Sequence, residues 1–238
     1  SKAQSANFPF CTIEPNKGII NVPDKRLITL QEIVNPEKLI PATVEIVDIA
    51  GLVKGASKGE GLGNKFLANI RETDAIIHVL RCFDNDNITH VDGSVDPIRD
   101  KEIIDIELQL KDLESLNNRL EKVSRTVKSG DKEAAREKEV LNQAISFIES
   151  SNNIRSIDLD EDDINKYLKP LQLITSKPVL YVCNVDERSV TSTNSYVESV
   201  KSLISDEGAN LIVLAAGIES EINELEDKQI LIIAGKGH

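Results

Sequence analysis

Residues 43–63 read TVEIVDIAGLVKGASKGEGLG, and this stretch decides the fold. It begins with β-branched residues at Val44, Ile46 and Val47, which predict a buried strand. After Asp48 the composition changes abruptly to a loop that is punctuated by glycines at positions 51, 55, 59, 61 and 63. We therefore expect a strand that carries a carboxylate at its carboxyl end and runs into a glycine-rich loop.

The spacing Asp48-x-x-Gly51 is typical of proteins that hydrolyse nucleotides with Mg²⁺. An aspartate at this place would hold Mg²⁺ through water, and the Gly51 amide could approach a γ-phosphate because no Cβ stands in the way. The same pattern also occurs where an ordinary strand ends in a loop. Its meaning therefore depends on the rest of the chain.

Composition limits the class of protein. The chain has 238 residues, of which 40% are hydrophobic and 29% charged, as in a globular protein with one large or two smaller domains. We expect no membrane segment, and the N-terminus lacks the pattern of a signal peptide. Three cysteines without metal-ligand spacing favour the cytoplasm. A net charge of −12 argues against DNA binding, so an RNA contact would need a local basic patch.

Further apolar runs predict strands over residues 76–83, 178–185 and 210–217, with helices over 64–74 and around 196–208. Strand and helix in alternation predict a parallel sheet with right-handed crossovers. Residues 1–42, which contain five prolines, predict only short pieces and a small helix over 27–34. Within this segment, Thr12 is either a turn hydroxyl or a switch threonine that binds Mg²⁺ and the γ-phosphate.

A heptad-like pattern interrupts the α/β rhythm. Apolar residues between Ile106 and Val127 predict a helix from about Ile103, and a second helix follows over 134–148, so the two form an antiparallel hairpin. Its tip, Arg119 to Lys138, holds seven basic and four acidic residues, a local charge of +3. The tip is either an ordinary solvated surface or a docking patch for RNA or an acidic partner. Asp160 predicts the N-cap of a further helix.

Candidate site residues follow each strand, at the edge where open α/β sheets bind ligands. In this order they resemble signatures of the P-loop GTPase superfamily. The segments NFPFCTIEPN and VDIAGLVKGASKGEGLGNKFLANIRETDAI, the helical insertion and NVDE are similar to the YchF-type Obg-like ATPases. The resemblance runs from Asn7 to about Glu226. It implies an Mg²⁺-dependent ATPase that acts as a nucleotide switch on the ribosome or the translation machinery.

The resemblance also implies roles for single residues. Thr12 and Asp48 would hold Mg²⁺, and Gly51 would contact the γ-phosphate. Asn184 would contact the purine, with Val185 and Glu187 beside it. Leu214, Ala215 and Ala216 would border the base.

Two positions bear on specificity and catalysis. Glu187 stands where the common GTPase pattern N-K-x-D has an aspartate that binds guanine, and its extra methylene places the carboxylate poorly for guanine, so adenine can compete. The resemblance implies that ATP is preferred over GTP. Leu52 stands where many GTPases carry a glutamine that orients water, so hydrolysis must rely on another group. His90 is the candidate, either as a titratable group in a loop or as plain surface. His78, within a strand, is expected in the core or at an edge.

The family pattern is not followed everywhere. The sequence contains no G-x-x-x-x-G-K-[ST] loop, so we expect an α/β, P-loop NTPase-type, mostly parallel sheet that is truncated at its first strand and binds ATP poorly as it stands. A C-terminal TGS domain would follow in the family, whereas residues 227–238 form an atypical tail. The expected domains are a nucleotide-binding domain in two parts, 1–98 and 166–226, and the helical insertion 99–165. The alternatives are a GTPase and a non-catalytic fragment that binds RNA or protein through the hairpin.

Overall fold

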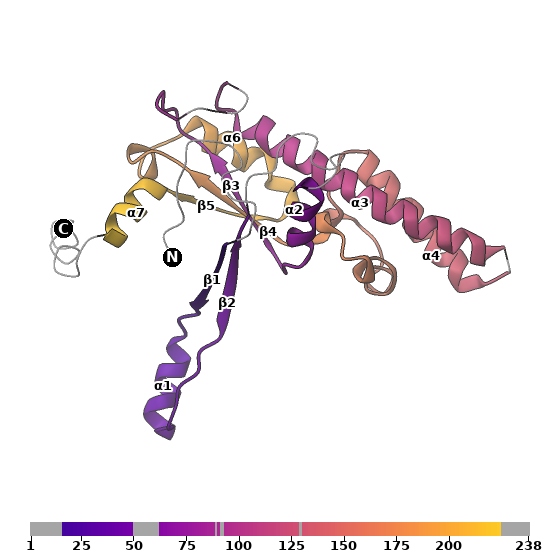
Figure 1. The fold of residues 1–238 in the computed structure, drawn as a ribbon, viewed down its shortest axis with the longest axis horizontal. Helices are drawn as coiled ribbons and strands as arrows, with labels where there is room; N and C mark the ends of the chain where they lie inside the picture. Colours follow the sequence, from indigo (N-terminus) through magenta and orange to yellow (C-terminus); the bar gives the residue numbers. More distant parts are fainter. Residues whose placement is uncertain (1–15, 50–61, 89, 91–92, 129, 225–238) are drawn as a thin grey trace. The chain divides into compact units, whose positions relative to one another are not determined.

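A computed structural model describes residues 16–49, 62–88, 90, 93–128 and 130–224, drawn in colour in Figure 1. The chain divides into two compact units between residues 51 and 52. None of the described helices combines the length and the apolar composition that crossing a bilayer requires. The predicted tail 227–238 lies outside the described residues.

The first unit is an antiparallel strand pair with a helix between the strands in the sequence. β1 (Asn16–Asn21) pairs with β2 (Thr43–Asp48), and Asn16 lies opposite Asp48. The helix expected over 27–34 is confirmed as α1 (Lys25–Val34), which begins where the side chain of Asp24 accepts a hydrogen bond from the Arg26 amide at 2.9 Å.

Three expectations for this unit are wrong. β1 was expected to be irregular, because NKGIIN shows no alternation of apolar and polar residues. β2 is the expected strand, but it is not buried, since Val44 and Ile46 are 46% and 41% exposed. Its partner is also the antiparallel β1 rather than a parallel strand. An alternating β-branched run predicts an extended backbone, whereas the partner strand and the covering layer are set by other parts of the chain.

The second unit contains the parallel sheet that the α/β rhythm predicts. Its strands are β3 (Ile76–Arg81), β4 (Val179–Asn184) and β5 (Asn210–Leu214), with β4 in the middle. In register, Arg81 lies beside Asn184, which lies beside Leu214. All three strands therefore end at one edge of the sheet.

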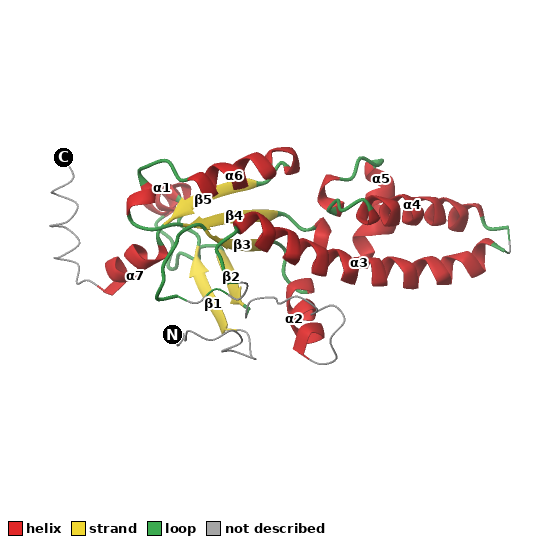
Figure 2. Ribbon diagram, turned by 90° about the horizontal axis from the view of Figure 1, so that it is seen from above, coloured by secondary structure: helices red, strands yellow, loops and turns green. Residues whose placement is uncertain are grey.

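One face of this sheet is covered by helix. α6 (Ser195–Leu203) connects β4 to β5 and buries Val197 and Val200 against Leu80 and Tyr181 of the sheet (Figure 2). Cys82 and Cys183 are fully buried in the same cluster, as ordinary small core residues. The remaining helices of the α/β part are α2 (Leu62–Arg71), before β3, and α7 (Ala216–Glu224), after β5.

The predicted helical hairpin is confirmed. α3 (Pro97–Val127) has 31 residues, about 46 Å at 1.5 Å per residue, and α4 (Lys132–Glu149) runs back along it. Figures 1 and 2 show the hairpin extending away from the sheet, with its turn at the far end. α3 begins earlier than the expected Ile103 because Asp96 caps the amides of Ile98 and Arg99 ahead of the apolar pattern.

The turn and the return of the chain complete this layer. Gly130 has φ +84°, a left-handed conformation that glycine adopts without strain, and Asp131 then caps α4. After α4 the chain folds back in short helical turns, among them α5 (Glu161–Asp163), which Asp160 caps as expected, and a π-helical turn over Ile164–Leu168. Side chains of these turns, such as Tyr167 and Leu168, join the apolar core of the hairpin.

A buried ionic network fixes the root of the hairpin to the sheet. Lys101 of α3 is 4% exposed, and its Nζ lies 2.7 Å from both a carboxylate oxygen of Asp105 and one of Glu207. The second oxygen of Glu207 accepts a hydrogen bond from the Tyr181 hydroxyl at 2.8 Å and lies 3.3 Å from a guanidinium nitrogen of Arg155. α3, the segment after the hairpin, β4 and the approach to β5 therefore meet in one polar cluster.

Charge in this cluster is balanced. Burial disfavours the ammonium of Lys101, but Asp105 and Glu207 outweigh that cost and raise the pKa of Lys101. Burial acts against the carboxylate of Glu207 as well, yet Lys101 and Tyr181 hold its pKa below the usual value. Beneath them, burial lowers the pKa of His78 to about 4, so this imidazole is neutral at physiological pH. His78 is half-buried on the edge strand β3 and packs against the ring of Tyr181, with 5.6 Å between ring centroids, in agreement with the expected position in the core or at an edge.

Candidate functional site

The carboxyl edge of the parallel sheet brings together the residues that were predicted to surround a base. The side-chain oxygen of Asn184, at the end of β4, accepts a hydrogen bond from the backbone amide of Ala216 at 3.0 Å. The amide of Val185 donates to the carbonyl of Leu214 at 2.9 Å. Residues 184–185 and 214–216, which are 30 residues apart in sequence, therefore form one hydrogen-bonded pair of loops.

Exposure along these loops varies from buried anchors to accessible groups. Val185 and Ala215 are 3% and 5% exposed and anchor the loops to the core, whereas Ala216 and Glu187 are exposed. Glu187 directly precedes a short 3₁₀ turn over Arg188–Val190. Its carboxylate thus stands at the surface of the strand edge, where a ligand could reach it.

A further residue, Arg81, shapes the loop after β3 and was not predicted. Its guanidinium donates to the carbonyls of Phe83, Asn85 and Ile88 at 3.1, 3.2 and 3.1 Å. Because this one side chain donates to three backbone carbonyls, it holds the loop in a fixed turn at the edge of the sheet. The only signal in the sequence is an arginine that ends an apolar strand and precedes a polar loop.

α6 supports the same loop from the other side. Asn194 caps α6 by accepting from the Val197 amide at 3.1 Å, and its side-chain nitrogen donates to the Cys82 carbonyl at 2.9 Å. The Tyr196 hydroxyl lies 3.0 Å from the carboxylate of Asp84. The end of β3 is therefore fixed both by α6 and by its own arginine.

His90 lies where this loop reaches the hairpin. Its Nε2 is 2.9 Å from a carboxylate oxygen of Asp100 in the first turns of α3, and the other oxygen of Asp100 accepts from the Arg99 guanidinium. The His90 side chain is 15% exposed. The imidazole is therefore held at the start of the hairpin by a carboxylate.

The predicted phosphate and metal residues belong to other parts of the sequence. Thr12, Gly51 and Leu52 fall outside the described residues. Asp48 ends β2 in the first unit and is exposed, and its carboxylate makes no hydrogen bond or ion pair with the described part of the chain. No group of three or more His, Cys, Asp and Glu side chains forms a metal cluster in that part. A single accessible carboxylate fits Mg²⁺, because this ion usually takes only one or two protein carboxylates as ligands. Water molecules and nucleotide phosphates fill its other coordination positions.

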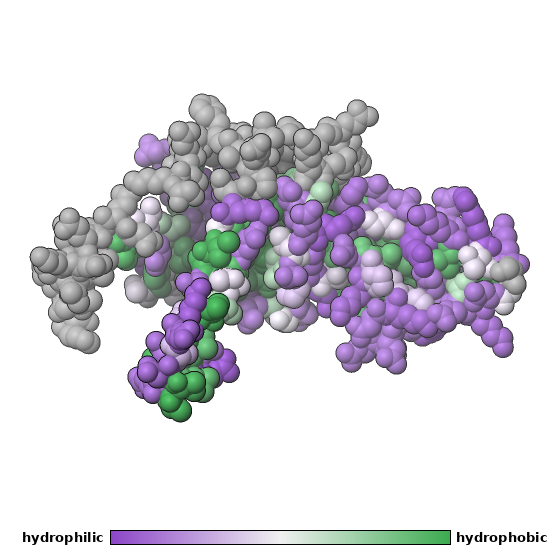
Figure 3. All heavy atoms as spheres, turned by 60° about the horizontal axis from the view of Figure 1, so that its bottom comes forward, coloured by the Kyte–Doolittle hydropathy of each residue, from purple (hydrophilic) through white to green (hydrophobic). Residues whose placement is uncertain are grey.

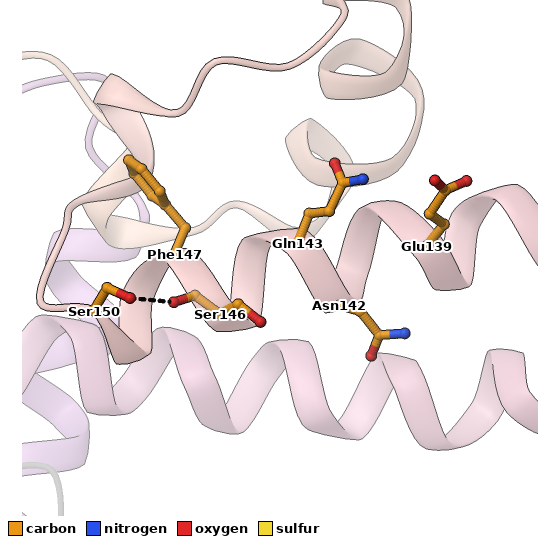
Figure 4. A pocket seen from close by; sticks show the side chains of 6 residues that line it. All are labelled: Glu139, Asn142, Gln143, Ser146, Phe147 and Ser150. Atoms are coloured by element: carbon orange, nitrogen blue, oxygen red, sulfur yellow. Dashed lines mark hydrogen bonds between the residues drawn. The ribbon is translucent and has the colours of Figure 1, made fainter.

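A surface hollow of about 510 Å³ lies along α4 (Figure 4). Its side chains come from successive turns of this one helix, and the Ser150 hydroxyl donates to the Ser146 carbonyl at 2.9 Å. Such a lining offers no polar groups that converge from several elements, as a ligand site does. The hollow is therefore a feature of the helix surface, lined by Glu139, Asn142, Gln143, Ser146, Phe147 and Ser150.

The sequence matches the family model described as 50S ribosome-binding GTPase over residues 1–122. It is 51% identical over 226 residues to the Ribosome-binding ATPase YchF of Haemophilus ducreyi, a match that covers 95% of this chain and 62% of that protein. The protein of the same name from Bacillus subtilis is 52% identical over 229 residues, with the same coverage.

A solved structure agrees with these matches. The structure of the Schizosaccharomyces pombe YchF GTPase is similar with a TM-score of 0.78 and 35% identity, covering 97% of this chain and 63% of that one. The chain thus spans about 62% of the length of the curated relatives. Because the family model covers more than half of the chain and the relatives are about 50% identical over 95% of it, the chain belongs to the YchF type of the P-loop GTPase family.

Proposed function

We propose that this chain forms the nucleotide-binding part of a cytoplasmic, Mg²⁺-dependent ATPase that works as a switch on the ribosome. The observation that carries the proposal is the joined pair of loops at the carboxyl edge, where the Asn184 side chain is held by the Ala216 amide. Relatives that cover 95% of the chain bear the name ribosome-binding ATPase, which supports the same activity.

The base would bind between these loops. Asn184, fixed by its hydrogen bond, would present its amide nitrogen to the purine, while Leu214, Ala215 and Ala216 border the ring. Val185 serves as a buried anchor for the loop. A pre-organised loop of this kind lowers the entropy lost when the ligand binds.

ATP rather than GTP is the proposed substrate, and Glu187 is the reason. An aspartate in the family's common pattern accepts two hydrogen bonds from guanine, whereas the longer glutamate displaces the carboxylate from that position. If the site does not accept hydrogen bonds from the guanine donors, guanine binds no better than adenine, which lacks the 2-amino group. GTP remains the alternative, in keeping with the names of the family model and of the solved relative.

The phosphate side is assigned by residue chemistry. Thr12 and Asp48 would hold Mg²⁺, and the Gly51 amide would donate to the γ-phosphate. Bound Mg²⁺ would neutralise charge that develops on the phosphate oxygens. Because Leu52 cannot orient water, unstimulated hydrolysis would be slow, and His90 is the proposed group that assists it. Its Nε2 contact with Asp100 would orient the ring for that role.

The helical insertion, 99–165, is the proposed ribosome contact. On the face shown in Figure 3, the hairpin presents mostly hydrophilic side chains. Arg119 and Arg125 of the tip pair with acidic neighbours Glu137 and Glu121, respectively. The side chains of four lysines make no hydrogen bond or ion pair with the described residues, and these unpaired charges suit RNA phosphates: Lys122, Lys128, Lys132 and Lys138.

Nucleotide binding tests the function directly. The 238-residue polypeptide and the same polypeptide extended at its N-terminus by a G-x-x-x-x-G-K-[ST] segment from a relative are titrated with fluorescent ATP and GTP analogues in the presence of Mg²⁺. We expect micromolar ATP binding only in the extended form, with ATP preferred. Micromolar binding without the segment would refute the expected weakness of the polypeptide alone.

The outcome also separates the alternatives. Absence of binding in both forms would leave the non-catalytic interaction fragment, in which the hairpin is the working surface. That alternative predicts ribosome co-sedimentation that falls when Lys122, Lys128 and Lys132 are changed to glutamate. The slope of the logarithm of the binding constant against the logarithm of the salt concentration should also decrease in magnitude by about one for each lysine that no longer neutralises a phosphate. The matched control is Lys201→Glu on α6, which lies outside the hairpin.

A further inference from the structure

The C-terminal residue of α2 joins three elements of the second unit. Nη2 of Arg71 donates to the Ser115 hydroxyl of α3 at 3.0 Å. The carbonyl of Arg71 accepts from Nζ of Lys177 at 3.0 Å, and Lys177 also donates to the Thr73 carbonyl. One end of α2 is therefore tied both to the hairpin and to the segment that leads into β4.

The same part of α3 carries a second, deeper tie. Asp112, three residues before Ser115 in the same helix, has no exposed surface. Its carboxylate accepts from the amides of Ile174 and Thr175 at 2.8 and 2.7 Å and from the Thr175 hydroxyl at 2.7 Å. A movement of α3 at this point is therefore transmitted to the loop before β4, the strand that ends in Asn184.

The guanidinium of Arg71 is incompletely satisfied. Its Nε is buried and has no hydrogen-bond acceptor among the described residues. A buried donor without a partner costs about 1–3 kcal/mol, so it needs an explanation. Burial raises the pKa of Asp112 and the charge of Arg71 opposes that rise, so the two groups are within electrostatic reach. A carboxylate is also the acceptor to which a guanidinium binds most strongly.

Ser115 and Asp112, three residues apart on α3, are therefore two acceptors that the guanidinium of Arg71 could use in turn. In this structure Arg71 uses the Ser115 hydroxyl and leaves Nε without an acceptor among the described residues. Pairing of Nε with the Asp112 carboxylate in place of Ser115 would require a movement of α2 relative to α3. α2 directly follows the glycine loop 51–61 in the sequence, and its buried Leu67 and Ile70 link its position to the core.

We propose that Arg71 is the coupling contact between the nucleotide-sensing loop and the helical hairpin, and that it exchanges between Ser115 and Asp112 when the nucleotide changes. The inference rests on the proposed function, since it assumes that the glycine loop senses the γ-phosphate. Linkage requires reciprocity: if nucleotide alters the affinity of the hairpin for the ribosome, ribosome binding alters nucleotide affinity by the same factor.

The test uses the full-length protein with purified ribosomes. The quantity measured is the ratio of the ribosome Kd with ADP to that with a non-hydrolysable ATP analogue, and separately the nucleotide Kd without ribosomes. Wild type should give a ratio that differs from one by at least about fivefold. Arg71→Ala should bring the ratio to within about twofold of one, while nucleotide Kd changes by less than about twofold.

Two further variants separate coupling from a structural role. Ser115→Ala removes one of the two acceptors and should also reduce the ratio, and in Arg71→Ala/Ser115→Ala the second change should add nothing. Lys177→Met is the matched control, because it weakens the same joint at the Arg71 carbonyl without touching the guanidinium. It should lower stability and leave the ratio as in wild type.

A readout without ribosomes completes the design. Hydrogen exchange of α3 amides near Asp112 and Ser115 should change between the ADP and ATP-analogue forms of wild type, and not in Arg71→Ala. A wild-type ratio preserved in Arg71→Ala, or a ratio of one in a wild type that binds ATP, would overturn the coupling. A wild type that binds no nucleotide would instead refute the proposed function.

Discussion

Replacement of Lys101 by methionine tests how firmly the hairpin is fixed to the sheet. Methionine fills the same volume but removes the ammonium that lies 2.7 Å from Asp105 and from Glu207. Glu207 would then keep Arg155, at 3.3 Å, and the Tyr181 hydroxyl as partners, whereas Asp105 would lose its ion pair. Two negative charges would remain near each other, 14% and 17% exposed.

The expected loss follows from these distances. Each contact is worth about 6 kcal/mol at 2.7 Å with an effective dielectric constant near 20, before the cost of removing the charges from water. Removal of one partner from a buried ion pair costs ~3–5 kcal/mol, and the partial exposure of the carboxylates places this case at the lower limit. Lys101→Met should therefore lower the free energy of unfolding by about 3 kcal/mol.

Urea unfolding followed by circular dichroism measures this difference. Lys201→Met is the matched control: Lys201 also contacts a glutamate of its own helix, Glu198, at 2.8 Å, but both side chains are about half exposed. Such a pair contributes less than about 1 kcal/mol. If Lys101→Met were no more destabilising than Lys201→Met, the network would not hold the hairpin, and this reasoning would be refuted.

Three other results are expected. The pKa of His78 falls from 6.5 to about 4 on folding, so between these pH values the unfolded state binds a proton that the folded state does not. The free energy of unfolding should therefore fall by roughly 3 kcal/mol as the pH drops from 6.5 to 4. Urea titrations at several pH values measure this fall, and His78→Phe should remove it. Asp112→Ala leaves two amides and the Thr175 hydroxyl without their acceptor and should lower the free energy of unfolding in urea by at least about 3 kcal/mol. Asp162→Ala, at an exposed aspartate, is the control. If both variants lost the same small amount of stability, the argument from the burial of Asp112 would be contradicted. Glu187→Asp should raise GTP affinity relative to ATP by about tenfold in analogue titrations, and an unchanged ratio would count against Glu187 as the base selector.

Local patterns in the sequence predicted much of this architecture. The apolar runs located β3, β4 and β5 to within a few residues at their ends, and heptad spacing gave both hairpin helices. These features are local, because periodicity reports which side of an element is buried. β1 was missed because a short strand with glycine and asparagine has no such periodicity.

Contacts between distant segments could not be predicted in this way. Lys101 and Glu207 are more than a hundred residues apart, and each looks like an ordinary charge on a solvated helix or turn. Burial of both depends on how the hairpin root meets the sheet, which no local pattern encodes. For the candidate site, the resemblance of the segments around Asn184, Glu187 and Ala216 to a family pattern implied a base site, whereas the hydrogen bond between Asn184 and Ala216 required the register of β4 and β5.

The position of the hairpin between β3 and β4 has a consequence for the order of folding. About 100 residues separate these adjacent strands, and closing so long a loop as a random coil is entropically unfavourable and slow. The hairpin contains mainly contacts between near neighbours in sequence, so it can form early and bring Asn153, which follows α4, back to Gln109 of α3, where their side chains form a hydrogen bond of 3.0 Å. The sheet would then close over a much shorter effective loop, and pulse-labelled amides of α3 and α4 should be protected before those of β3 and β4. The insertion would thus act as an internal scaffold for the assembly of the parallel sheet whose strands flank it in the sequence.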